Sequence, residues 1–111
     1  MRTFCTNTII ITGHVGEKIE SKTIGDDVKV YISSIGLPYS KKDSEETNWE
    51  SFQFETWRGV AEQCADKLTK GSKVLIEGAL RNDRWTDSDG NTQYKTYIRA
   101  ERAEFINLKA E

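Results

Sequence analysis

Hydrophobic and polar residues alternate along most of this chain, which is the pattern of β-strands rather than of helices. Residues 7–15 contain an apolar, β-branched run suited to a strand with both faces largely covered. Further strands are predicted over Val28–Ser34 and Trp49–Trp57. Alternation in the last of these puts Phe52 and Phe54 on one face, the expected core side, and leaves tryptophans on the polar face.

Polar segments between these strands predict connecting structure. Residues 17–24 are polar, with Ile19 as the expected inward side chain, and Gly25-Asp26-Asp27 supplies a turn. Residues 36–48 hold the only proline and a dense cluster of polar side chains. We expect this segment to be a long, exposed, mobile loop.

The longest β pattern, over residues 73–107, predicts an extended β-hairpin. Asp89-Gly90-Asn91 tolerates positive φ and is typical of its turn. Val74 and Leu80 mark the apolar face of the outgoing strand. Arg81, Asp83 and Trp85 share the opposite face of that strand, and on the return strand Lys95, Tyr97 and Arg99 share one face. An indole and guanidinium groups at the outer end of a hairpin suit a surface that binds something flat and negatively charged.

A single amphipathic helix is predicted over Val60–Leu68, with Gly71 as its C-terminal cap. The predicted order is therefore three strands, one short helix and two strands, without an internal repeat or a domain boundary. This order predicts one domain over residues 1–111, all-β with one short helix. The matching architecture is the OB-fold, a five-stranded Greek-key barrel, here with an extended β-hairpin.

Composition limits how such a domain could bind nucleic acid. The chain has 111 residues and a formal net charge of −2, which argues against binding phosphates through overall positive charge. A nucleic-acid site would need a local basic groove with stacking side chains. No apolar run approaches the roughly 20 residues of a membrane span, and the N-terminus has no signal-peptide pattern. We therefore expect Cys5 and Cys64 to be reduced thiols in a cytoplasmic protein.

Residues for catalysis or metal binding are few. His14 is the only histidine, so the sequence predicts no enzyme, no metal site and no cofactor. Residues 87–91, Asp-Ser-Asp-Gly-Asn, suggest a calcium loop but lack its spacing, and a hairpin turn is the preferred interpretation. A small nuclease or metal-dependent hydrolase is the alternative class, which a strand-cleavage assay with and without divalent metal separates.

Aromatic and basic residues gather on the polar strand faces and the adjoining loop. The candidates for nucleic-acid binding are Tyr39, Trp49, Trp57, Arg58, Arg81, Arg84, Trp85, Lys95, Tyr97 and Arg99. Stacking on an aromatic ring contributes about 1–3 kcal/mol for any base, and arginine adds phosphate contacts and cation–π attraction. The same pattern fits a second aromatic cluster or an oligomer interface, so from the residues alone both interpretations stay open.

Several motifs, in order, resemble the bacterial-type single-stranded DNA-binding protein family. Residues 7–16, Asn-Thr-Ile-Ile-Ile-Thr-Gly-His-Val-Gly, are similar to its opening strand. Ala61-Glu62 followed by Lys70–Arg81 is similar to its central signature, and Trp85–Gly90 matches the Trp-x-Asp-x-x-Gly of its hairpin tip. The resemblance covers nearly the whole chain.

This resemblance implies an OB-fold that wraps single-stranded DNA around a homotetramer, with a dimer as the alternative. It also implies a nucleoid-associated role in DNA replication, recombination or repair. Trp85 matches the family's hairpin-tip tryptophan, Trp57 the aromatic at the end of strand three, and Tyr39 the aromatic after strand two. The family's further strand-three tryptophan aligns with Ser51, and Trp49 on the same face is the expected substitute.

The C-terminus departs from the family pattern. The family usually ends in a glycine- and proline-rich linker with an acidic tip that recruits replication and repair enzymes, whereas this chain ends in Asn-Leu-Lys-Ala-Glu. We expect either a removed tail or a tailless relative of phage, plasmid or primosomal type. The alternative function is a primosomal or accessory OB module that acts mainly through protein contacts and binds single strands weakly. Nothing in the sequence separates DNA from RNA.

Overall fold

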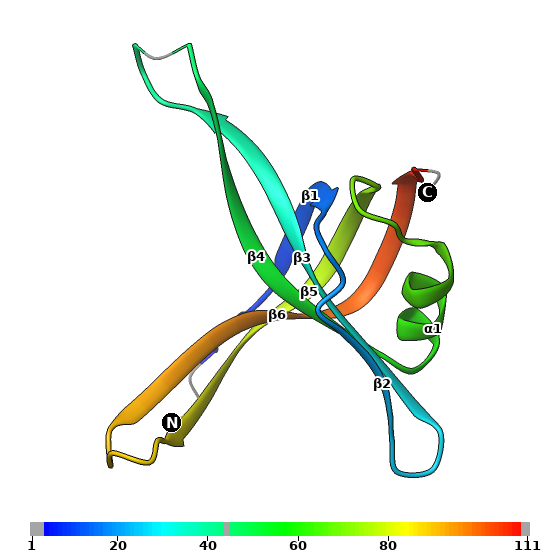
Figure 1. The fold of residues 1–111 in the computed structure, drawn as a ribbon, viewed down its shortest axis with the longest axis vertical. Helices are drawn as coiled ribbons and strands as arrows, with labels where there is room; N and C mark the ends of the chain where they lie inside the picture. The colour runs from blue at the N-terminus through cyan, green and yellow to red at the C-terminus, as the bar shows by residue number, and fades with distance from the viewer. Residues whose placement is uncertain (1–3, 44, 110–111) are drawn as a thin grey trace.

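A small coiled sheet with projecting hairpins and one helix at its side makes up the protein (Figure 1). The computed structural model describes residues 4–43 and 45–109. The elements in chain order are β1 (Ile9–Val15), β2 (Glu20–Ile24), β3 (Val28–Ser40), β4 (Thr47–Trp57), α1 (Arg58–Lys67), β5 (Lys73–Thr86) and β6 (Thr92–Asn107). Within the described ranges, no helix has the length and apolar character needed to cross a membrane.

The strands form one sheet in the order β1-β5-β6-β4-β3-β2, and β1 pairs with β3 as well. Neighbouring strands are antiparallel except β4 and β6, which are parallel. The additional pairing of β1 with β3, at His14–Gly36 and Val15–Ile35, curls the sheet round on itself. Helix α1 lies between β4 and β5 in the chain and packs mainly against β3, with further contacts to β4 and β6. The helix precedes the final hairpin as the sequence predicts, but four strands come before it instead of the predicted three.

The hydrophobic core lies where these strands and the helix meet. Phe54, Ile35 and Ile76 are fully buried, and Cys64 of α1 packs among them. Burying a large apolar side chain stabilises a fold by roughly 1.5–3 kcal/mol. The core is small, so it supports only the centre of the sheet, and the outer parts of the long strands carry mostly exposed side chains.

Gly78 marks the position where the β5–β6 hairpin leaves the barrel. The register of the two strands shifts between Glu77 and Gly78, which is a β-bulge. A Cβ atom on Gly78 would overlap the carbonyl oxygen of Arg99 and lie 2.9 Å from the Cα atom of Ala100, so a larger residue requires the backbone to move. Residues 80–96 include no buried side chain, and Figure 1 shows this hairpin as an arm reaching away from the barrel.

Segments predicted to connect the strands are strands themselves. β3 continues to Ser40 and β4 begins at Thr47, so the predicted loop over residues 36–48 is mostly a second projecting hairpin (Figure 1). The loop prediction was wrong because both faces of this hairpin are open to solvent, which gives paired strands a polar composition. β2 was missed for the same reason, since all its residues are exposed although they pair with β3.

Some expected core residues are exposed. Ile19 was predicted to point inward and is exposed, and Leu80 is also exposed. Phe52 lies on the same face as the buried Phe54 but is 44% exposed, because the sheet extends past the edge of the core there. The predicted hairpin and helix are present, with α1 beginning and ending within two residues of the predicted range.

Candidate nucleic-acid interface

Strand register brings most of the candidate residues onto one continuous face. In β4 the odd-numbered residues from Trp49 to Trp57 share a side, and Glu55 in that row is paired with Arg99 of β6. The row continues through the β5–β6 pairs Ala79–Arg99, Arg81–Tyr97, Asp83–Lys95 and Trp85–Gln93. This surface, named here the aromatic face, includes Trp49, Trp57, Arg81, Trp85, Lys95, Tyr97 and Arg99.

Trp57, at the end of β4, is held by polar contacts on the aromatic face. Its Nε1 donates a hydrogen bond of 2.6 Å to Oε1 of Glu55. The guanidinium carbon of Arg99 lies 4.9 Å from the centre of its ring, within the range of a cation–π interaction. These contacts give the half-buried indole a defined orientation with a cation beside it.

A shallow cavity of about 480 Å³ adjoins Trp57. Arg58, Arg81 and Arg99 all line it, and they come from α1, β5 and β6. Each arginine carries a planar, permanently charged group that can bind phosphate through paired hydrogen bonds. The structure therefore gathers three candidate cations around one candidate ring, an arrangement suited to a nucleic-acid backbone that passes a stacked base.

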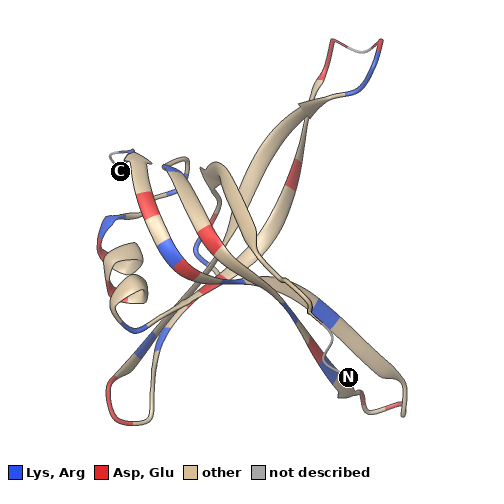
Figure 2. Cartoon of the chain, turned by 180° about the vertical axis from the view of Figure 1, so that it is seen from behind, with Lys and Arg blue, Asp and Glu red and all other residues tan. Residues whose placement is uncertain are grey.

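The candidate cations form no ion pair among the described residues, although Glu101 also lines the cavity beside Trp57. Across residues 4–43 and 45–109, the observed ion pairs are Lys22–Glu20, Lys70–Glu17, Arg102–Glu77 and Arg102–Glu104. None of them involves a candidate residue. Figure 2 shows basic positions along the projecting β5–β6 hairpin with acidic ones between them, so the positive charge of the interface is local and compatible with the net charge of −2.

Arg58 has an unusual backbone conformation. It is the first residue of α1, and its φ of 57° lies in the left-handed region that favours glycine. Residues held in such conformations are strained and cluster at binding sites. Arg58 therefore combines a strained backbone with a position beside Trp57 in the cavity, and nothing in the sequence pattern indicates this strain.

Asp87 organises the tip of the β5–β6 hairpin. Its Oδ1 accepts hydrogen bonds from the backbone N–H groups of Asp89 and Asn91 at 3.0 and 2.9 Å, and its Oδ2 accepts one from the amide of Gln93 at 2.9 Å. The Gln93 amide, followed by the Asn91 N–H, lowers the pKa of Asp87. Gln93 is also the cross-strand partner of Trp85, so this network orders the residue beside a 47% exposed indole. The predicted hairpin turn is present.

Two candidates lie away from the aromatic face. Tyr39 pairs with Asn48, which puts it on the opposite side of the β3–β4 hairpin from Trp49. Arg84 pairs with the exposed Tyr94, on the opposite side of the β5–β6 hairpin from Trp85. Tyr94 is therefore an exposed ring beside a candidate cation that the sequence analysis missed, because its pairing is visible only once the register is known.

Tyr97 lies on the aromatic face but offers little surface for stacking. It is only 9% exposed, and its hydroxyl lies 3.5 Å from Oδ1 of Asp83. Burial, followed by the nearby carboxylates of Glu55 and Asp83, raises its pKa. A neutral hydroxyl with its ring packed at the base of the hairpin supports neighbouring residues more than it supplies an open platform.

Asn7 ties the segment before β1 to the hairpin. Its side-chain amide donates to the carbonyl oxygen of Leu80 at 2.8 Å, and its side-chain oxygen accepts the N–H of Leu80 at 2.9 Å. The carboxamide thus continues the ladder of hydrogen bonds between β1 and β5 beyond Ile9. This role explains an asparagine immediately before an apolar strand.

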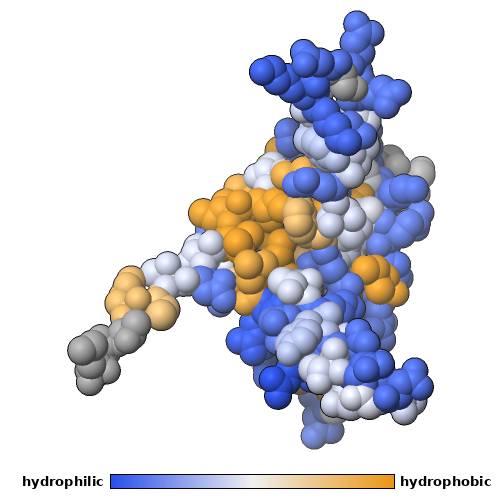
Figure 3. Space-filling view, turned by 90° about the vertical axis from the view of Figure 1, so that its left-hand side faces the viewer, coloured by the Kyte–Doolittle hydropathy of each residue, from blue (hydrophilic) through white to orange (hydrophobic). Residues whose placement is uncertain are grey.

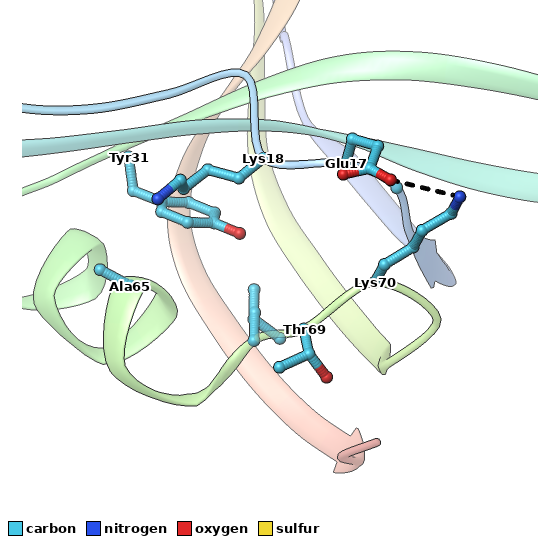
Figure 4. Close-up of a pocket in the computed structure, with 8 residues that line it drawn as sticks. Glu17, Lys18, Tyr31, Ala65, Thr69 and Lys70 are labelled. Carbon is cyan, nitrogen blue, oxygen red and sulfur yellow. Dashed lines mark ion pairs between the residues drawn. The ribbon is translucent and has the colours of Figure 1, made fainter. Parts of the chain in front are cut away.

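A second cavity, of about 400 Å³, lies apart from the aromatic face (Figure 4). Its lining comes from the segment after β1, from Tyr31 of β3 and from the C-terminal end of α1. Glu17 and Lys70 form an ion pair of 3.3 Å across part of it, drawn as a dashed line in Figure 4. None of the candidate nucleic-acid-binding residues is among the described residues that line this cavity.

Comparison with known proteins agrees with the sequence motifs. Residues 6–106 match the model of the "Single-strand binding protein family". The chain is 30% identical over 111 residues to "Single-stranded DNA-binding protein 1" of Xylella fastidiosa, covering 95% of this chain and 80% of that protein. It is 31% identical over 98 residues to "Single-stranded DNA-binding protein" of Rickettsia conorii, covering 83% of this chain and 64% of that protein.

A solved structure, "Plasmodium falciparum SSB complex with ssDNA", has the same fold. It superposes with a TM-score of 0.80 at 19% identity, covering 98% of this chain and 100% of that chain. This likeness confirms the predicted OB-fold. Because the family model spans most of the chain and agrees with the motifs, the chain belongs to the single-strand binding protein family.

Proposed function

We propose that this chain binds single-stranded DNA with little sequence preference, along the aromatic face. The observation that carries the proposal is the cavity beside Trp57, which Arg58, Arg81 and Arg99 line and where the Arg99 guanidinium and Glu55 hold the indole. Within the described chain, none of the three arginines is paired with an acid. Family membership and the names of the relatives support the same function.

Stacking and charge have separate parts in this mechanism. Bases stack on Trp49, Trp57 and Trp85, each ring contributing about 1–3 kcal/mol. Because every base has a π-face, stacking does not select among them. The arginines and Lys95 bind phosphates and release counterions, so affinity falls as salt rises. Tyr39 and Arg84, on the other sides of their hairpins, contact a strand that passes around the hairpin edges.

A protein that covers single strands in this way protects them during DNA replication, recombination or repair. We propose that it is cytoplasmic and associated with the nucleoid. Covering a strand requires no cofactor, metal or catalytic group, and we propose no enzymatic activity. Incubating labelled oligo-dT with the protein, with and without Mg²⁺, tests this point. Shorter fragments would indicate a nuclease instead.

We also propose that the protein acts as a homo-oligomer, a tetramer with a dimer as the alternative. In the described part of the chain, β1 pairs with β5 along one edge but with β3 only at His14 and Val15. Ile10 of this strand is 64% exposed, and Figure 3 shows hydrophobic side chains gathered on one face of the molecule. A free strand edge with exposed apolar side chains is a surface that a second copy can cover. Sedimentation that detects only monomers would contradict this proposal.

The direct test is a titration of tryptophan fluorescence with oligo-dT at two salt concentrations. We expect strong quenching at a stoichiometric ratio and weaker affinity at the higher salt. Trp57→Ala and Trp85→Ala should each weaken binding about 5- to 150-fold, with unchanged circular dichroism spectra. Unchanged affinity in both variants would remove the stacking mechanism, and weak binding by the unaltered protein would favour an accessory module that acts through protein contacts.

Arg102→Ala is the control variant, which measures how far removing an arginine that is already ion-paired changes affinity. The Arg102 guanidinium already pairs with Glu77 and Glu104, at 3.1 and 2.6 Å. Its removal should therefore change affinity much less than removal of Arg81 or Arg99. A parallel titration with oligo-rU decides between DNA and RNA.

A further inference from the structure

The indole of Trp49 lies across the sheet instead of standing free on its hairpin. Trp49 is on β4, opposite Pro38 of β3. Its ring extends over Gly36, where an added Cβ atom would lie 3.4 Å from Cε3 of the indole. It then reaches His14 on β1, with ring centroids 5.8 Å apart and an interplanar angle of 72°. The indole thus spans three strands in space while remaining 57% exposed.

His14 is itself held firmly. It is the residue at which β1 pairs on both edges, with Lys73 of β5 and with Gly36 of β3. Its Nδ1 lies 3.3 Å from the carbonyl oxygen of Gly71, within hydrogen-bond distance. The half-buried imidazole is therefore a fixed edge against which the neighbouring indole rests.

An edge-to-face contact of this kind restricts the rotamers of an otherwise exposed side chain. Ordering such a side chain on binding has an entropic cost, and a ring that is already ordered avoids most of it. We propose that His14 is a positioning residue, which holds Trp49 in the orientation in which its exposed surface stacks a nucleobase. The inference rests on the proposed binding of single-stranded DNA and adds His14 and Gly36 to the residues that shape the site.

A double-mutant cycle tests the coupling. Oligo-dT affinity is measured for the unaltered protein, His14→Ala, Trp49→Ala and the double variant. We expect about tenfold weaker binding for Trp49→Ala and about threefold for His14→Ala. The double variant should bind no more weakly than Trp49→Ala alone, because His14 acts only through the ring. Losses that multiply in the double variant would overturn the inference.

Two further variants separate positioning from a general effect on β1. His14→Phe keeps an aromatic edge against Trp49 and should restore affinity to within about twofold of the unaltered protein. Thr12→Ala is the matched control, because Thr12 is exposed on the same side of β1 and should not affect binding. Circular dichroism checks each fold, and His14→Asn replaces His14→Ala in the cycle if the alanine variant does not fold. A His14→Phe variant that binds as weakly as His14→Ala would count against positioning.

A second readout needs no DNA. With Trp57→Phe and Trp85→Phe, Trp49 is the only tryptophan left, and its anisotropy decay reports motion of that ring. His14→Ala should increase the amplitude of the fast component, and His14→Phe should not. An unchanged amplitude overturns the inference. Failure of the unaltered protein to bind oligo-dT overturns the proposed function and the inference with it, whereas normal binding with multiplied losses overturns the inference alone.

Discussion

Replacing Arg58 with glycine should make the protein more stable while weakening its binding to DNA. The φ of Arg58 is 57°, in the left-handed region, where a residue with a Cβ atom is disfavoured by about 1–2 kcal/mol. Glycine avoids this strain but loses about 0.5–1 kcal/mol more chain entropy on folding. The difference between these two ranges predicts that Arg58→Gly raises the free energy of unfolding by up to about 1.5 kcal/mol.

The effect of Arg58→Gly on binding has the opposite sign. Arg58 lines the cavity beside Trp57 and forms no ion pair among the described residues. Losing one phosphate contact should lower the slope of log affinity against log salt by about 0.7 for a single strand. Affinity should therefore fall most at low salt, where the lost contact contributes most.

Urea denaturation at a fixed protein concentration measures the first effect, and oligo-dT titrations over a range of salt measure the second. Gly59→Ala is the matched control at the same junction. Gly59 has no positive φ, and a Cβ atom there meets nothing within 4 Å. This control should gain about 0.5–1 kcal/mol in the free energy of unfolding with an unchanged salt slope. An Arg58→Gly variant that is less stable, or that keeps the full salt slope, would refute the reasoning.

Three further predictions concern the hairpin and the thiols. Gly78→Ala should destabilise the fold by about 1–3 kcal/mol, because its Cβ would overlap the carbonyl oxygen of Arg99. A melting temperature close to that of the unaltered protein would contradict this. The lowered pKa of Asp87 means that its stabilisation of the hairpin tip is present at neutral pH and is lost as the pH falls below about 4 towards the folded-state pKa. The amide resonance of Asn91, whose N–H donates to the Asp87 carboxylate, should therefore shift in that range, and Asp87→Asn should abolish the shift. Burial raises the pKa of Cys64 to about 11. Iodoacetamide at mildly alkaline pH should therefore alkylate the exposed Cys5 and spare Cys64. Equal labelling of the two cysteines, measured by mass spectrometry, would show that α1 does not protect the Cys64 thiol.

Alternation along single strands predicted the faces correctly, because it depends only on local backbone geometry. It placed Trp57 and Trp85 on the sides away from the apolar residues, as observed. It could not predict where each strand passes the edge of the core. Phe52 and Phe54 share a face, but only Phe54 lies under α1 and the neighbouring strands, and nothing local distinguishes the two.

The candidate site depends on contacts between distant parts of the chain. Arg58, Arg81 and Arg99 meet beside Trp57 because β4 runs parallel to β6 at Phe54–Ile98 and Glu55–Arg99. Helix α1 and strand β5 separate these two strands in the sequence, so periodicity contains no information about their contact. For the same reason, the sequence analysis selected Arg84 and Tyr39 together with the residues of the aromatic face, although register puts them on other sides.

Register along the β5–β6 hairpin decides which residues form the aromatic face, since a shift of one residue moves every side chain of a strand to the other side. With such a shift in β6, Thr96 would replace Tyr97 opposite Arg81, and Tyr94 would replace Lys95 opposite Asp83. Two features oppose this shift from the two ends of the arm. At the base, the backbone of Gly78 passes so close to Arg99 that only glycine fits, and at the tip, Asp87 binds Gln93 directly. Gly78, which meets Arg99 only at its backbone, and Asp87 at the tip therefore determine that Trp85, Lys95 and Arg99 face the same way.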